Sequence, residues 1–139
     1  MIINGENLIL GRLATLVAKQ ALLGEKVEII NAEKIVIVGK RDNIVANYKQ
    51  KFNRKTPRKG PFIPRMPDRL VRRMIRGMLP YKKERGSEAF KRIMCHIGTP
   101  DNFKSEEITT LDNINVLKSN NINYITIKEL CKLLGNTNA

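Results

Sequence analysis

Positive charge is concentrated in one continuous stretch of this 139-residue chain. Residues 40–92 contain eighteen of the 26 Lys and Arg residues but only four of the 13 Asp and Glu residues, which gives them a net charge of +14. The segments before and after have net charges of 0 and −1. A surplus of that size repels itself unless a polyanion neutralises it. The chain therefore divides into a neutral frame (1–39 and 93–139) and a basic segment (40–92), whose first candidate partners are nucleic acids and anionic membranes.

Length and hydropathy narrow these possibilities. A chain of this size with 42% hydrophobic residues predicts one domain, residues 1–139, with a core of its own. Apolar runs such as 35–38 are far too short to span a bilayer, and polar residues interrupt the N-terminus where a signal peptide would be apolar. We therefore expect a cytoplasmic protein without a membrane partner. Cys95 and Cys131 stand far apart in the sequence, and we expect both to be buried thiols.

The neutral frame has an α/β pattern. A short apolar opening at 1–3 precedes a helix rich in Ala and Leu, predicted over 11–23 and ended by Gly24. Apolar runs at 27–30 and 35–38 then predict strands covered on both faces, and the strand–helix–strand order suggests a parallel sheet. Near the C-terminus, Thr126 and Glu129 have the spacing of a capping box, which predicts a short helix with Leu130, Leu133 and Leu134 on its apolar face and Gly135 at its end.

The basic segment predicts two helices around a loop. Ile44, Tyr48 and Phe52 form an apolar stripe on a helix over 40–54. Residues 56–67 contain four prolines and one glycine, which excludes a helix and predicts an extended basic loop. A second helix is predicted over 68–79, with start signals at Pro67 and Asp68 and a stop at Pro80.

The helix over 68–79 has two chemically opposite faces. One is apolar, with Leu70, Val71, Met74, Ile75 and Met78, and predicts docking on the core. The other carries Arg69, Arg72, Arg73 and Arg76. A solvated surface is the simpler explanation for most charged faces, but such faces usually mix signs, and this one does not. Since the guanidinium fork can donate two parallel hydrogen bonds, an all-arginine face favours phosphate binding.

Further cations extend this predicted surface. In the loop, Gly60 permits close approach to a sugar–phosphate backbone, and Phe62 is predicted either to stack on an unpaired base or to anchor in the core. The RNA-binding residues predicted from the basic segment are Lys40, Arg41, Lys49, Lys51, Arg54, Lys55, Arg58, Lys59, Arg65, Arg69, Arg72, Arg73, Arg76, Lys82, Lys83, Arg85 and Arg92.

Catalytic interpretations find little support. His96 is the only histidine, and no second His or Cys lies at metal-ligand spacing from it, so we expect a buried or interface histidine and no metal site. The stretch from Gly5 to Leu13 has five residues between its glycines and then Arg-Leu, whereas a phosphate-binding loop has four and then Lys-Ser or Lys-Thr. We therefore expect no catalytic residues, no cofactor and no small-molecule substrate.

Five short stretches, in the same order, resemble the large-subunit ribosomal protein L13 family: GRLATLVAK at 11–19, INAEKI at 30–35, RKGPF at 58–62, IRGMLP at 75–80 and RG at 85–86. The resemblance is to the archaeal and eukaryotic branch, and the short chain favours an archaeal source. It implies a three-layer α/β/α domain with a mostly parallel sheet. It also implies a structural role in the large ribosomal subunit, in contact with large-subunit rRNA and neighbouring ribosomal proteins. Tyr81 and the pair Cys95-His96 depart from the family pattern, and the match is faint beyond residue 100.

Two other functions remain as alternatives from the residues themselves. A DNA-binding regulator would explain the charge, but it would normally present a recognition helix with Asn or Gln as well as Arg. An enzyme of nucleotide metabolism would explain an α/β frame, but it needs a phosphate loop or acid–base residues. Neither requirement is met by the sequence.

Overall fold

A computed structural model describes residues 1–103, 107–120 and 122–136 of the chain. A four-stranded sheet lies at its centre in the order β4-β2-β1-β5. Its strands are β1 (Ile2–Asn4), β2 (Val27–Ile30), β4 (Ile93–Cys95) and β5 (Ile108–Thr109), and all three pairings are parallel. The predicted α/β class with a mostly parallel sheet is confirmed.

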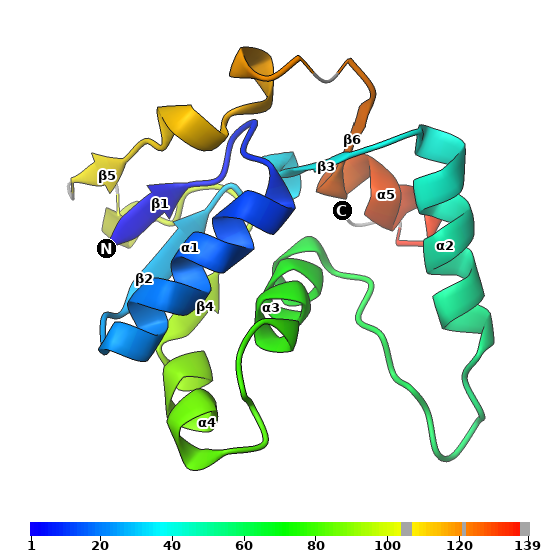
Figure 1. Ribbon diagram of the computed structural model, residues 1–139. Coiled ribbons are helices and arrows are strands. Elements are labelled where there is room, and N and C mark those ends of the chain that lie inside the picture. The colour runs from blue at the N-terminus through cyan, green and yellow to red at the C-terminus, as the bar shows by residue number, and fades with distance from the viewer. Residues whose placement is uncertain (104–106, 121, 137–139) are drawn as a thin grey trace.

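Helices cover one face of this sheet (Figure 1). They are α1 (Leu10–Leu23), α3 (Pro67–Gly77) and α4 (Glu84–Lys91), and α1 contacts both of the others. On this face Ile3, Ile29 and Cys95 lie in one row across the strands and belong to the main hydrophobic core. The predicted helix over 11–23 is confirmed, and Gly24 ends it with φ of +105°.

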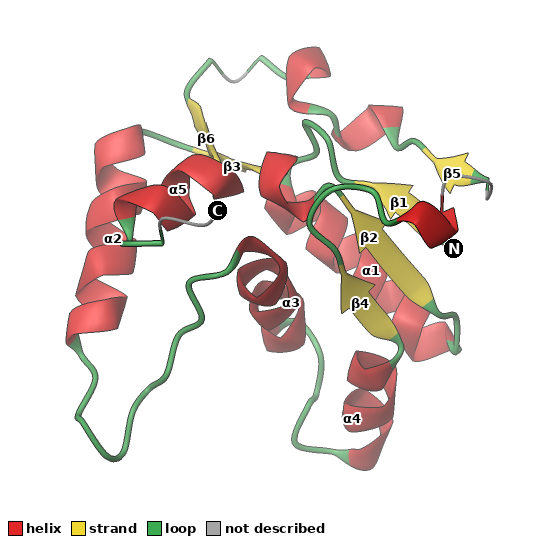
Figure 2. Cartoon of the chain, turned by 180° about the vertical axis from the view of Figure 1, so that it is seen from behind, coloured by secondary structure: helices red, strands yellow, loops and turns green. Residues whose placement is uncertain are grey.

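The opposite face of the sheet carries a thinner layer. Segment 96–103, which includes the short 3-10 helix η2 (Asp101–Phe103), crosses this face (Figure 2). The backbone of this segment accepts hydrogen bonds from the N–H groups of Asn31 and Ala32, at 2.9 and 3.0 Å. Among the strand residues on this face, Glu28 is buried, whereas Met94 is partly exposed. The third layer of the domain is therefore built from loop and 3-10 backbone in the part of the chain that the structure describes.

A second, two-stranded sheet corrects one expectation. The run at 35–38 does form a strand, β3 (Val36–Val38), but β3 pairs antiparallel with β6 (Tyr124–Thr126) and lies outside the parallel sheet. The reason is that β2 already has β1 and β4 as neighbours, so that no edge of β2 is free for β3. The described part of the C-terminal segment thus supplies strands to both sheets. Along the chain, the 3-10 helices η3 (Asp112–Ile114) and η4 (Val116–Lys118) lie between β5 and β6. A further 3-10 helix, η1 (Ala32–Lys34), connects β2 and β3.

The helix α5 (Ile127–Leu133) follows β6 directly. The hydroxyl of Thr126 accepts a hydrogen bond from the backbone N–H of Glu129 at 3.2 Å, which confirms the predicted cap. Leu130 and Leu134 are buried as expected, but Leu133 is 40% exposed.

The basic segment leaves the frame and returns to it. It begins with α2 (Arg41–Asn53), continues through the loop and ends in α3 and α4 (Figure 1). Ile44 and Tyr48 are buried and Phe52 packs against the core, which confirms the predicted stripe of α2. On α3, Leu70, Val71 and Ile75 are buried. The helix ends at Gly77 rather than at 79, and Met78 beyond it is 45% exposed, so that the apolar face is shorter than predicted.

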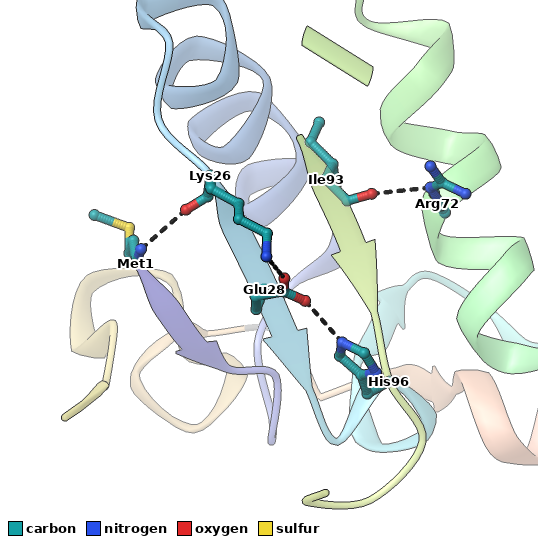
Figure 3. Close-up of polar contacts among 6 residues, drawn as sticks. All are labelled: Met1, Lys26, Glu28, Arg72, Ile93 and His96. Atoms are coloured by element: carbon teal, nitrogen blue, oxygen red, sulfur yellow. Dashed lines mark hydrogen bonds and ion pairs between the residues drawn. The ribbon is translucent and has the colours of Figure 1, made fainter. Parts of the chain in front are cut away.

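A polar cluster lies on the thinly covered face of the sheet (Figure 3). One carboxylate oxygen of Glu28 is 2.7 Å from Nε2 of His96, and the other is 3.1 Å from Nζ of Lys26. Burial by itself raises the pKa of Glu28, but the hydrogen bonds from His96 and Lys26 and the charges of these groups together lower the pKa below its ordinary value. His96 is half-buried, and its ring contacts Glu28 within the fold.

Glu28→Gln is expected to flatten the acid side of the stability profile. Because the pKa of Glu28 is lower in the folded than in the unfolded state, its carboxylate stabilises the fold above its unfolded pKa, and this contribution disappears as the pH falls through the folded pKa. Between about pH 7 and pH 3, the melting temperature of the wild type should fall more steeply than that of Glu28→Gln. The exposed Glu25→Gln variant is the control. Equal pH slopes for the wild type and Glu28→Gln would contradict the assignment.

Candidate nucleic-acid interface

The helix α3 brings four arginines together at the surface. Pro67 occupies its first turn, where a missing N–H costs nothing, and the buried side of the helix rests on the core. On the other side Arg69, Arg72, Arg73 and Arg76 line one shallow pocket, together with Pro64 and Phe90. The predicted division of the helix into an apolar and an arginine face is confirmed.

Arg72 differs from its neighbours because its guanidinium is used within the fold. Nε donates to the carbonyl of Ile93 at 2.9 Å and Nη2 to that of Phe90 at 3.4 Å (Figure 3 shows the first bond). The guanidinium carbon lies 4.4 Å from the centroid of the Phe90 ring. Arg72 therefore connects α3 to the start of β4. Sequence reasoning missed this role, since nothing in the spacing of the arginines distinguishes Arg72 from the others.

The other arginines of this face have fewer or weaker partners. Nη1 of Arg73 donates to the carbonyl of Phe62 at 2.7 Å and so holds the loop against α3. Arg76 lies over the ring of Tyr81, 4.9 Å from its centroid. Arg69 makes no hydrogen bond, ion pair or ring contact with the described residues. Arg69 and the unused donors of Arg73 and Arg76 remain available to an external anion.

The loop between α2 and α3 carries exposed cations at its tip. A turn is closed by hydrogen bonds between Thr56 and Gly60 in both directions, each 3.1 Å long, and Arg58 and Lys59 lie within it. Gly60 has φ of +77°, a conformation that side-chain-bearing residues rarely adopt. Phe62 is 67% exposed, which excludes the core-anchor alternative and leaves its ring accessible.

The remaining predicted residues are spread along the basic segment. Arg65 lies over the ring of Phe52, 5.4 Å from its centroid, and Arg92 is half-buried and donates to the carbonyl of Ala21 at 3.3 Å. Arg41 pairs with Glu129 at 2.8 Å. The exposed ones are Lys40, Lys49, Lys51, Arg54, Lys55, Lys82, Lys83 and Arg85.

The predicted contact residues are largely free of acidic partners. Within the ranges that the structure describes, Arg41 is the only one of the seventeen that lies within 4.0 Å of a carboxylate oxygen. Glu88 of the basic segment pairs instead with Lys91, at 2.7 Å. The positive charge of the segment is therefore left unneutralised by the described residues.

The described residues form neither a metal site nor a membrane-spanning helix. No group of three His, Cys, Asp or Glu side chains is placed to hold a metal ion there, and none of the described helices is long and apolar enough to cross a membrane. Cys95 and Cys131 are free and buried, as expected. Burial raises the pKa of the Cys95 thiol to about 12 and that of Cys131 to about 11. Neither sulfur is an activated nucleophile.

A family profile described as "Ribosomal protein L13" matches residues 1–102, which include the whole basic segment and the parallel strands β1, β2 and β4. The chain belongs to the ribosomal protein L13 family. The resemblance seen in the five short sequence stretches is confirmed.

Three archaeal members of the L13 family illustrate the similarity. Each is named large ribosomal subunit protein uL13. The protein of Methanocaldococcus jannaschii is 46% identical over 138 residues, which cover 96% of both chains. That of Methanococcus maripaludis is 45% identical over 97% of both chains. That of Methanopyrus kandleri is also 45% identical, over 96% of this chain and 86% of its own. These matches continue beyond residue 100, where the resemblance had been faint.

The two roles within the arginine face can be separated by mutation. Arg72→Gln should lower the free energy of unfolding by about 1–3 kcal/mol, because it leaves the carbonyl of the buried residue Ile93 without its charged donor. Arg69→Gln, which removes the same charge from the same helix, should change it by less than about 0.5 kcal/mol. Urea denaturation of both variants provides the measurement. If the two variants unfold at the same urea concentration, Arg72 does not hold α3 to β4.

Proposed function

We propose that this chain is a structural constituent of the large ribosomal subunit, which binds large-subunit rRNA and stabilises its folded form. The observation that carries the proposal is a basic segment with almost no acidic partners among the described residues, displayed on the fold of an L13 family member. The relatives are named large ribosomal subunit proteins, which makes rRNA the natural source of the missing negative charge.

The proposed mechanism is neutralisation combined with recognition of shape. Folded rRNA brings phosphates close together, and cations held on a rigid protein reduce their repulsion. Arginine forks on α3 donate to phosphate oxygens, while the extended loop follows the surface of the RNA. Since the grooves of A-form helices hide most base identity, the protein is proposed to recognise backbone geometry and unpaired nucleotides. All seventeen predicted residues belong to the proposed surface, with Arg41, Arg72 and Arg92 contributing mainly through the fold.

The proposal extends to partners and location. The chain is expected to act on the cytoplasmic ribosome, beside neighbouring large-subunit proteins, and without enzymatic activity, cofactor or small-molecule substrate. Duplex DNA is a competitor in the binding test, because a DNA-binding regulator would prefer it to rRNA.

Binding to large-subunit rRNA should depend steeply on salt. If roughly six to ten phosphates are neutralised, affinity should fall by about three to five orders of magnitude between 50 and 200 mM salt. The triple variant Arg58→Gln, Lys59→Gln, Arg69→Gln should make the slope of log K against log salt shallower by about 0.7–0.9 for each phosphate that is no longer neutralised. Filter binding at several salt concentrations measures this slope.

A matched control removes the same charge from the neutral frame. Arg12, Lys19 and Lys128 are exposed, and changing all three to Gln should leave the slope nearly unchanged. A flat salt response of the wild type, or equal slopes for both triple variants, would show that the basic segment is not the contact surface.

A further inference from the structure

A cavity of about 360 Å³ opens where three parts of the basic segment meet. The last turns of α2 form one side, α3 forms another, and residues of the loop close the third. Its volume lies within the range of about 300–1,000 Å³ that is typical of small-molecule sites. It is separate from the shallow pocket over the arginine face, although Arg73 borders both.

The inner surface of the cavity is apolar and is continuous with the hydrophobic core. Leu70 and Tyr48 are almost completely buried and belong to the core, and Met74 and Ile63 pack against that core. The Tyr48 hydroxyl lies 3.6 Å from the sulfur of Met74, which occupies its proton. No amide or carboxylate side chain of the described residues lines the cavity. The interior therefore suits an apolar body and offers no amide or carboxylate that would bind polar groups on it.

The rim of the cavity is cationic. Lys51, Arg54 and Arg73 are its charged lining residues. Lys51 lies over the Tyr48 ring at 4.9 Å, and Arg73 uses one donor on the Phe62 carbonyl, so that both are positioned but keep their charge. Arg54 is exposed. A ligand that fits both regions has an apolar body and a negative charge beside it.

We infer that this cavity receives a single unstacked nucleotide of the bound RNA, with the base against Pro61, Ile63 and Met74 and its phosphate at the cationic rim. This inference rests on the proposed function. A base within a continuous helix is covered on both faces by its neighbours, so only an extruded nucleotide can enter. Because no amide or carboxylate side chain of the described residues lines the cavity, and its cations are assigned to the phosphate, the site accepts different bases and responds mainly to the presence of a base.

The test fills the cavity without changing charge. Ile63→Trp places a large side chain in the wall that belongs to the loop, outside any helix or strand. The affinity of this variant for a transcript of Methanocaldococcus jannaschii large-subunit rRNA should fall about five- to hundredfold, the fold-change that corresponds to the stacking of one base. The salt slope should stay unchanged, because every cation of the surface is retained. Leu117→Trp, at an exposed position of η4, is the matched control and should bind like the wild type.

A positional measurement decides the matter if Ile63→Trp lowers the melting temperature. A benzophenone side chain at position 63 should crosslink to an unpaired nucleotide of the same transcript. A crosslink to a nucleotide within a Watson–Crick duplex, or to protein alone in assembled subunits, overturns the inference. Unchanged affinity of a normally folded Ile63→Trp variant also overturns it while leaving the proposed function intact. If the wild type binds duplex DNA as tightly as rRNA, the proposed function is refuted, and the inference with it.

Discussion

The whole basic segment depends on the packing of one side of α3. Leu70, Val71 and Ile75 are fully buried, and this short stripe holds the centre of a strongly charged segment on a neutral core. Burial of such side chains contributes about 1.5–3 kcal/mol each and holds α3 on the core. The hydrogen bonds of Arg72 to the Phe90–Ile93 region fix the helix against β4, and the bond from Arg73 to Phe62 fixes the loop against the helix. The positions of the cations on α3 and on the adjoining part of the loop follow from these contacts.

Features that arise from neighbouring residues could be predicted from the sequence. The helices α1, α2, α3 and α5, the cap at Thr126 and the two faces of α3 all follow from periodicity and capping within a few residues. Pairing of β3 with β6 could not be predicted, because it joins residues almost ninety positions apart and depends on which sheet edge remains free. For the same reason the exposure of Met78, which lies just beyond the end of α3, could not be predicted. Periodicity gives the direction of a side chain, but not whether another segment covers it.

The candidate site shows the same limit more sharply. Composition identified the basic segment and its cations, and the exposure of Arg58 and Lys59 agrees with that prediction. Composition could not separate them from Arg72 and Arg92, whose donors reach carbonyls of β4, α4 and α1. An arginine that binds a backbone carbonyl and one whose donors are free to bind a phosphate look the same in the sequence. The distinction depends on whether a carbonyl lies within reach, which only the tertiary arrangement determines.

Aromatic rings order several of the cations that have no acidic partner among the described residues. A long cationic side chain without a partner carries about 2 kcal/mol of rotamer entropy, part of which is lost on binding. Five of the seven Phe and Tyr residues lie in the basic segment, and four of these, Tyr48, Phe52, Tyr81 and Phe90, each lie within 5.4 Å of a Lys or Arg charge. A carboxylate would also order the cation, but it would cancel the charge. A cation–π contact with a neutral ring contributes about 0.5–1 kcal/mol at an exposed position. It restricts the side chain and leaves the positive charge available. The fifth ring, Phe62, has no such cation among the described residues, and its exposed face is open to a base.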